Sequence, residues 1–256
     1  MEAKGGCVKV VCLVCGSAGS KTNTLLMGQQ INSLIEFLER QGFTIEELND
    51  PFEINGFVAG LDKPYITPMS SPLSNDFSVS NYCPLVLRQA GEPVMMGCAR
   101  LEDLAREGID TYWSRIFIQA YSADGNDKVI GNVRAKVKAR FNGRSVYFGD
   151  LFVSRSFRGS RLALRAFVAI GHLVTTLRWD ANQTYCFIRE RDILRGAAAL
   201  YGFNQLISKP FDWLIEPPTP RDRSEVLANL DAEDIHYHVA SVVEAIRRQN
   251  ALRTTK

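Results

Sequence analysis

Two arginines frame a short glycine-containing turn, Arg158-Gly159-Ser160-Arg161, in the middle of the chain. The turn follows an apolar run from Val146 to Val153, which predicts a buried strand, and it precedes a stretch with the apolar spacing of a helix. A strand that enters a helix through such a turn exposes the unpaired N–H groups of the first helical turn, which attract an anion together with the helix dipole. The spacing therefore predicts a turn that can hold phosphate oxygens. The alternative is an ordinary helix start in which Arg158, Arg161 and Arg165 form a solvated face.

This segment resembles motif A of the GCN5-related N-acetyltransferases, in which Arg/Gln-x-x-Gly-x-Gly/Ala follows a strand ending Asp-Leu-x-Val. Asp150-Leu151-Phe152-Val153 matches the strand, and Arg158 and Ala163 match the turn. Arg161 departs from the pattern, because it stands where the family usually has its middle glycine. The resemblance implies that the turn binds the pyrophosphate of acetyl-coenzyme A or another acyl-coenzyme A. The residues that it implies for the cofactor site are Phe152, Val153, Arg158, Gly159, Ser160, Arg161, Leu162 and Ala163.

Acyl transfer to an amine needs a group that removes a proton from the ammonium, donors that stabilise an oxyanion, and an acid that protonates the thiolate. Asp150 is our candidate for the base or the amine-binding carboxylate, because it lies on the strand just before the turn. It could instead cap a turn or pair with a nearby arginine. Gly149 stands where some polyamine-type relatives have a glutamate, which favours a water relay over a direct base. Backbone N–H groups near Phe152 and Val153 would meet the oxyanion.

Tyr201 is our candidate acid, because a phenol with an ordinary pKa of about 10 stays protonated at neutral pH. The run Ala199-Leu-Tyr-Gly-Phe203 resembles motif B of the same family, which ends a helix with a tyrosine followed after three residues by Gly-Phe. In this chain the family's tyrosine position falls on Ala198, whereas Tyr201 directly precedes Gly202. Packing of Tyr201 against Phe203 is the alternative to the acid role.

The neighbouring elements favour the same fold. Val129–Phe141 alternates apolar and basic residues and is followed by Asn142-Gly143, which predicts a strand and a hairpin turn into the strand that ends at Val153. Apolar spacing predicts a helix over Leu162–Leu177 and a buried strand over Thr184–Ile188. Asp192–Leu200 is typical of a helix that Gly202 ends. The resemblance implies an α/β fold with a mixed, mostly antiparallel central sheet, helices on both faces and a helical C-terminal extension.

The chain as a whole divides into three parts. Residues 1–22 are a segment of uncertain order, 23–216 are the acyltransferase-like domain and 217–256 are the helical extension. The expected elements are a helix over Thr24–Gln41, a loop-rich lid over Asp50–Asp76, a hairpin over Pro84–Arg88 and Val94–Ala99, a mainly helical Glu102–Tyr121, and helices over Arg221–Leu252.

Composition narrows the class of protein. The 256 residues carry a formal net charge of +2 and are 46% hydrophobic, values of an ordinary globular enzyme. No run is long enough to cross a membrane, and the apolar Val8–Val14 is too short for a secretory core, so we expect a cytoplasmic protein. The run Gly16–Thr22 lacks the glycine spacing of a P-loop. We interpret all six cysteines as reduced thiols, and Cys12-x-x-Cys15 has no second pair that would complete a metal site.

The sequence predicts an N-acyltransferase that uses acyl-coenzyme A and an amine acceptor, without a nucleic-acid or membrane partner. The acceptor cannot be read from the sequence. One alternative uses longer acyl chains from an acidic acyl carrier protein, docked on the basic face of Arg134, Lys136, Lys138 and Arg140, which also fits a solvated edge. The other is a binding module that keeps the fold without the chemistry. The C-terminal tail could also mediate a homodimer.

Overall fold

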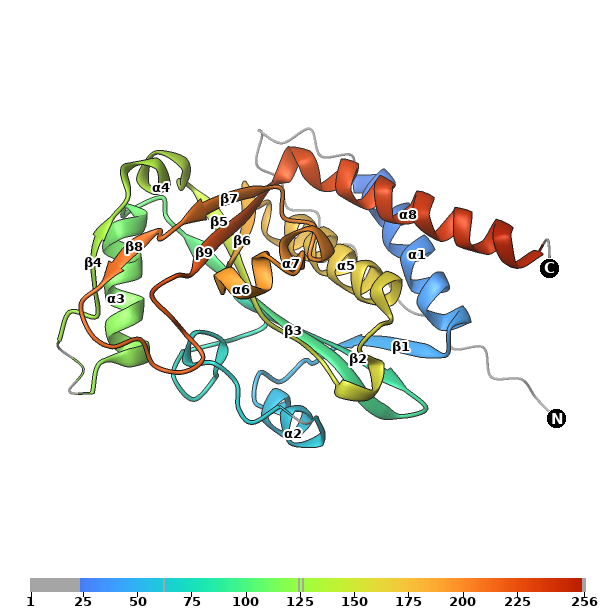
Figure 1. The fold of residues 1–256 in the computed structure, drawn as a ribbon, viewed down its shortest axis with the longest axis horizontal. Helices are drawn as coiled ribbons and strands as arrows, with labels where there is room; N and C mark the ends of the chain where they lie inside the picture. The colour runs from blue at the N-terminus through green and yellow to red at the C-terminus, as the bar shows by residue number, and fades with distance from the viewer. Residues whose placement is uncertain (1–23, 62, 124, 126, 255–256) are drawn as a thin grey trace.

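One sheet of seven strands organises the chain. The computed structural model describes residues 24–61, 63–123, 125 and 127–254. Within these residues the strand order is β1-β2-β3-β5-β6-β9-β7 (Figure 1). Neighbouring strands are antiparallel except for β5 and β6, which are parallel. This is the mixed, mostly antiparallel sheet that the sequence predicts. Its strands are β1 Phe43–Glu47, β2 Tyr82–Gln89, β3 Glu92–Asp103, β5 Arg144–Val153, β6 Gln183–Ile188, β7 Gln205–Ser208 and β9 Val226–Asp231.

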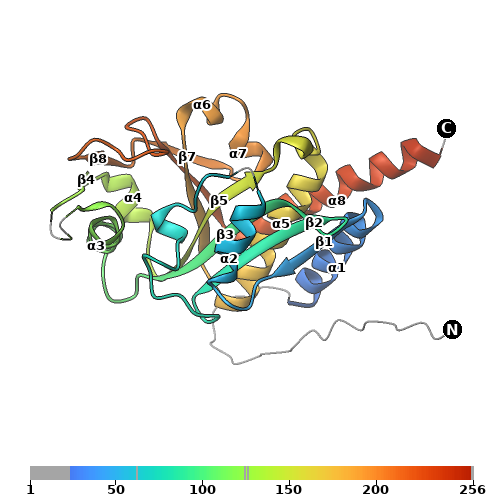
Figure 2. The same ribbon diagram turned by 90° about the horizontal axis from the view of Figure 1, so that it is seen from below.

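Helices cover both faces of this sheet, as predicted. The long helices α1 Thr24–Arg40, α5 Arg161–Trp179 and α8 Ala232–Thr254 pack against one another on one face, whereas α2 Glu53–Gly60 lies on the other (Figure 1, Figure 2). Strand β2 shows why, because successive side chains of a strand point to opposite faces. Leu85 and Leu87 enter the core beneath α5, and Val86 between them packs with α2. None of the described helices is both long and apolar enough to span a bilayer.

A smaller unit lies beside the sheet. Strand β4 Ile130–Val133 pairs with β8 Phe211–Trp213, and helices α3 Ile109–Tyr121 and α4 Ala135–Arg140 lie next to this pair (Figure 1). Its aromatic rings pack edge to face on Phe187 of β6, with ring centroids 5.2 Å apart for Trp113 and 5.6 Å apart for Phe211. Such pairs contribute about 0.5–1.5 kcal/mol each beyond their buried area. The unit is therefore fixed to the strand that borders the site described below.

The centre of the sheet opens where its two parallel strands separate. The paired register of β5 and β6 covers only Ser145–Tyr147 and Gln183–Tyr185. Beyond it, β5 continues to Val153 along β3, with a β-bulge in which Asp150 adopts a φ of 52°. The edge of β5 that faces β6 has no strand partner there among the described strands. The bulge and the early end of the pairing leave a gap between the two strands.

The predicted strand over Val129–Phe141 is wrong. Only Ile130–Val133 is a strand, and α4 follows at Ala135. From residue 133 onward the buried residues are Val133, Val137 and Phe141, which are spaced by four, the spacing of one helical face. The alanines between them are exposed and favour a helix over a strand, so counting them as part of an apolar strand face was wrong.

Two consequences follow from this correction. Asn142-Gly143 does not join two strands of a hairpin, although Gly143 has a φ of 61° just before β5. The predicted basic strand face of Arg134, Lys136, Lys138 and Arg140 does not form. Arg140 pairs with Asp231, and Arg134 Nη1 donates to the Ser208 carbonyl at 2.7 Å. The docking strip for a carrier protein therefore loses its structural basis.

Several other boundaries differ from the sequence predictions. The loop-rich range 50–76 contains α2 and a 3-10 turn, η1 Pro68–Ser70, and β3 reaches Asp103 before helix α3 begins. The helix predicted over Asp192–Leu200 is two short helices, α6 Glu190–Ile193 and α7 Ala197–Leu200, separated at Gly196 with a φ of 87°. The helices predicted over Arg221–Leu252 are wrong for residues 226–231, which form β9 between β6 and β7. The division at residue 217 stays a prediction, and the P-loop-like run and Cys12-x-x-Cys15 lie outside the described residues.

Most of the predicted elements are confirmed. The helix at 162–177 is α5, the helix at 24–41 is α1, and the strand at 184–188 is β6. The hairpin of β2 and β3 turns at Ala90-Gly91, where φ is 50° and 85°. Gly202 ends its helix with a φ of 80°, as expected for a left-handed terminator.

Candidate functional site

The separation of β5 and β6 opens a cavity of about 610 Å³. The predicted residues Asp150, Phe152, Val153, Arg158 and Tyr201 all line it. Segments distant in sequence complete the walls, among them 63–67, the start of α6, and the chain before β9. The structure therefore brings both predicted catalytic side chains and part of the predicted cofactor site to one cavity.

The turn between β5 and α5 has the geometry of an anion-binding helix start. A short 3-10 turn, η2 Arg155–Phe157, leads to Gly159, whose φ of 119° strongly favours glycine. Helix α5 begins at Arg161, and Ser160 makes no side-chain cap there. The Arg161 N–H donates to the Gly159 carbonyl at 2.7 Å, so the N–H groups that follow it in the first turn are the ones that the Ser160 hydroxyl leaves uncovered. Arg158 lines the cavity, whereas Arg161 is exposed and Ala163 is buried in the core.

Asp150 is fully engaged within the protein. Its side chain is 0% exposed, and Lys63 Nζ lies 2.8 Å from Oδ1. The backbone N–H of Thr67 donates to the same oxygen at 3.2 Å, and the Thr67 hydroxyl donates to Oδ2. The carboxylate therefore holds the 63–67 segment against the bulge of β5. Its partner is a lysine rather than the arginine considered from the sequence, and its role as a base stays a prediction.

A side chain cannot be accommodated at Gly149. A Cβ added there would lie 2.6 Å from carbons of the Tyr147 ring, which is itself buried. Real Cβ atoms do not approach other atoms so closely, and the core around Tyr147 leaves it no room to move. The absent glutamate thus has a steric reason, and a carboxylate base has to come from another part of the cavity.

Tyr201 meets the requirement of an acid that stays protonated. Burial raises its pKa to about 12, helped by Cys186 and Asp192 and opposed by Arg189. It follows α7 directly, and its carbonyl lies 2.9 Å from His172 Nε2 of α5. Ala198, at the tyrosine position of the family pattern, is buried in the core. The phenol at 201 rather than 198 therefore reaches the cavity.

His172 behind Tyr201 gives a testable pH dependence. Burial, assisted by His238, lowers the pKa of His172 to about 3. Below about pH 6.5 the unfolded chain binds a proton at this residue that the folded protein does not bind until about pH 3. His172 therefore leaves the free energy of unfolding unchanged above pH 6.5 and lowers it progressively as the pH falls towards 3. We expect this residue to account for about 3 kcal/mol of lost stability by pH 4.

Urea unfolding between pH 7.5 and 4 measures this effect. His172→Phe should flatten the pH dependence of the unfolding free energy by that amount, and His236→Gln, on α8, should leave it unchanged. An unaltered pH dependence in His172→Phe would show that the folded protein does protonate this ring.

The second wall carries charged residues that sequence reasoning missed. Arg189 Nε lies 2.7 Å from Asp192 Oδ2, and the largely exposed Arg195 reaches the other oxygen at 3.9 Å. Arg221 and Glu225 form an ion pair, with 2.7 Å between Nε and Oε1. The spacing of four residues between Arg221 and Glu225 is the one sign of this pair in the sequence. Both residues fall in the predicted helical extension, outside the predicted domain.

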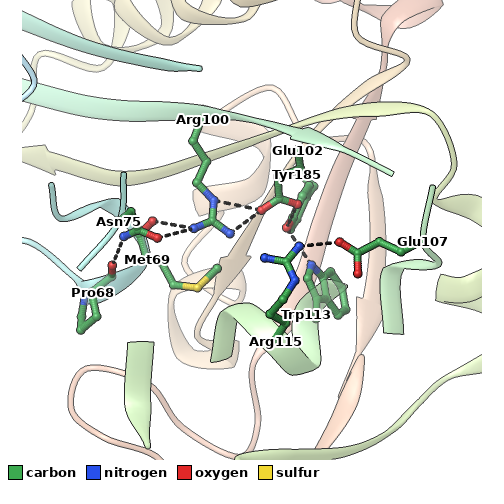
Figure 3. A network of polar contacts seen from close by, with 9 residues as sticks. All are labelled: Pro68, Met69, Asn75, Arg100, Glu102, Glu107, Trp113, Arg115 and Tyr185. Atoms are coloured by element: carbon green, nitrogen blue, oxygen red, sulfur yellow. Dashed lines mark hydrogen bonds and ion pairs between the residues drawn. The ribbon is translucent and has the colours of Figure 1, made fainter. Parts of the chain in front are cut away.

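Figure 3 shows a second buried ion pair, Arg100 and Glu102, with its partners. The Arg100 guanidinium lies 5.5 Å from the ring centroid of Tyr147, which lines the cavity. Arg100 donates to Glu102 Oε1 from Nε at 3.0 Å and from Nη2 at 2.6 Å, and the Tyr185 hydroxyl donates to Oε2 at 2.6 Å. Arg100 Nη1 also donates to the Met69 carbonyl at 3.0 Å, and Trp113 donates to Tyr185 at 2.8 Å. Tyr185 is the last residue of β6 paired with β5, so this network fixes the point at which the strands separate.

No protein-family model matches the chain, and no curated protein matches it either. Among solved structures, it is similar to NAA60 of Arabidopsis thaliana in complex with acetyl-CoA (11% identity, 75% of this chain and 99% of that one, TM-score 0.44). It is also similar to an acetyltransferase of the GNAT family from Streptococcus pneumoniae (10%, 74% and 99%, 0.42). A third is the spermidine/spermine N-acetyltransferase SpeG from Vibrio cholerae (10%, 76% and 98%, 0.42).

Proposed function

We propose that the protein is an N-acyltransferase that transfers an acyl group from acyl-coenzyme A directly to an amine. The observation that carries the proposal is the cavity between β5 and β6, whose lining includes Tyr201 and reaches Arg158, three residues before the uncapped start of α5. A strand edge without a partner can bind an extended amide-containing arm, as strand edges bind peptides. The pantetheine of coenzyme A is such an arm, and its pyrophosphate suits the turn at Gly159.

The roles of the lining residues follow from their surroundings. Arg158 neutralises phosphate charge, and backbone N–H groups near Phe152 and Val153 meet the oxyanion of the transferred acyl group. Tyr201 gives its phenolic proton to the leaving thiolate. Asp150 acts through Lys63 and Thr67, holding the segment that closes one side of the cavity. Acetyl is the acyl group that we favour, because the sequence resemblance implies it.

Coenzyme A binding tests this proposal and predicts a large effect of charge reversal. A ligand at a hundredfold excess over its Kd stabilises the folded state by about 2.7 kcal/mol, which for this chain length raises Tm by roughly 5–10 °C. We expect this shift with coenzyme A and acetyl-coenzyme A. Arg158→Glu should abolish it by placing a carboxylate beside the phosphates.

Arg106→Glu is the matched control, because Arg106 is exposed in the turn before α3 and does not line the cavity. It makes the same change of charge and should keep the full shift. If coenzyme A and its acyl derivatives leave the Tm of the wild type unchanged, the donor assignment is wrong.

A further inference from the structure

The Arg221–Glu225 pair in the wall of the cavity differs from the Arg100–Glu102 pair. Both side chains are only 5% exposed, yet they lie within the lining of the cavity. Arg221 is surrounded by aromatic rings, with its guanidinium carbon 4.6 Å from the Phe187 centroid and 5.5 Å from that of Trp213. The rings fix the guanidinium in place, so the small unit containing β8 helps to shape this wall.

The two groups are incompletely paired. A buried arginine and carboxylate can make two parallel contacts, but this pair makes one, between Nε and Oε1. Arg221 Nη2 and Glu225 Oε2 are buried and have no hydrogen-bond partner among the described residues, and Arg221 Nε, although 2.7 Å from Oε1, makes no hydrogen bond of good geometry either. In the Arg100–Glu102 pair, both carboxylate oxygens of Glu102 accept hydrogen bonds. Buried polar atoms are ordinarily satisfied, so an unpartnered donor and an unpartnered acceptor on two residues that line a cavity indicate a binding position.

Glu225 also has the protonation behaviour that an amine-binding group needs. Burial raises its pKa, and the Arg221 charge opposes that rise. A carboxylate brought closer to neutrality can accept a proton from an ammonium more readily than an exposed one. Asp150, by contrast, is occupied by Lys63 and Thr67, and Gly149 offers no side chain.

We propose that Arg221 and Glu225 form the acceptor subsite and that the acceptor is an α-amino acid unit, an amine with a carbonyl or carboxylate oxygen on the adjacent carbon. Glu225 Oε2 accepts an N–H of the amine, and Arg221 Nη2 donates to that oxygen. The inference rests on the proposed function. It extends that function by naming the class of acceptor and its binding residues.

The chemistry balances with these groups. Glu225 takes one proton from the ammonium, and the freed lone pair of the nitrogen forms the C–N bond to the thioester carbonyl carbon. The C–S bond breaks, and the thiolate leaves with a proton from Tyr201. The new amide nitrogen loses its second proton to the tyrosinate, and Glu225 releases its proton to solvent. Acyl-coenzyme A and an ammonium thus give an amide, free coenzyme A and one proton.

Binding of small amines to the wild type is the first test, because it needs no variant. Glycinamide, glycine and glycylglycine each carry an amine with a carbonyl or carboxylate oxygen on the adjacent carbon. Glycine represents a free amino acid, and the other two represent a chain end. Ethylamine has the amine but lacks the oxygen. With the protein saturated by coenzyme A, titration calorimetry should show binding for the first group at least tenfold tighter than for ethylamine. Equal affinities, or no binding of any of them, would overturn the proposal.

Variants then assign the contacts. Glu225→Gln should lower kcat/KM for the best acceptor about 100-fold, with a loss in kcat as well as a rise in KM. Arg221→Lys keeps the positive charge but loses the planar guanidinium with its parallel N–H donors. It should raise KM for glycinamide and not for ethylamine. Glu216→Gln is the control, because Glu216 lies in the same segment and is 88% exposed beside Arg223.

Different results would contradict the proposed function and the proposed acceptor subsite. If the wild type does not bind coenzyme A, the proposed function is wrong, whereas titrating glycinamide into the free protein still tests the subsite. If coenzyme A binds and amines are acylated, but Glu225→Gln and Arg221→Lys act like the control, the acceptor subsite lies elsewhere.

Discussion

Replacing Arg100 with methionine is expected to lower the free energy of unfolding by about 3–5 kcal/mol, because Glu102 would remain as a buried carboxylate without its cation. Both side chains are almost inaccessible, with exposed fractions of 3% and 0%. The substitution also removes the donor to the Met69 carbonyl, which fixes the segment that leads from the cavity wall to β2. Equilibrium urea unfolding measures the change.

Two further variants make this result interpretable. Arg248→Met breaks an exposed ion pair on α8, with exposed fractions of 77% and 50%, and should cost no more than about 0.5 kcal/mol. The double variant Arg100→Met/Glu102→Gln should recover part of the loss, since it removes the unpaired charge. A loss in Arg100→Met no larger than in Arg248→Met would mean that Glu102 is not buried as described.

Tyr201→Phe is expected to lower kcat about 100-fold, the scale of a lost general acid. The phenol donates a proton to the leaving thiolate, and phenylalanine keeps the ring but not the proton. Binding of coenzyme A should not change. Because the pKa of Tyr201 is raised to about 12, wild-type kcat should show no loss from its deprotonation up to pH 10. Steady-state kinetics with measured coenzyme A release tests both statements.

Tyr237→Phe is the control for this prediction, because Tyr237 is 69% exposed on α8. It should keep wild-type kcat. If Tyr201→Phe also keeps it, the tyrosine packs against its neighbours, as the alternative interpretation has it, and the thiolate is protonated by another group.

The local signals in the sequence were sufficient for much of the fold. Two apolar runs on either side of Gly91 located β2 and β3, and the apolar stripe located α5 within two residues at each end. The turn at Gly159 was found because its glycine and the following helix are adjacent in the chain. Asp150 and Tyr201 came to one cavity because the end of β5 and the end of α7 both border it.

The errors have a common physical origin in tertiary contacts. The period-two pattern at 133–141 is overridden by the burial of Val137 on one face of a helix, which the alanines at 135 and 139 also favour. Strand β9 is a short run whose identity depends on the edges of β6 and β7, which lie on either side of it. The Arg221–Glu225 pair was missed for the same reason. Its significance comes from rings contributed by α3, β6 and β8, and the first two of these elements are far from it in sequence.

The central claim is that this chain moves an acyl group from coenzyme A to an amine. The measurement that tests it most directly is mass-spectrometric detection of the N-acetylated product, with thiol release, from acetyl-coenzyme A and a panel of amines that includes glycinamide. We predict one equivalent of free coenzyme A for each acetylated amine, with the rate lowered in Tyr201→Phe. Binding of coenzyme A without acetylation of any amine in the panel would contradict the claim and identify a binding module that has the fold but not the chemistry.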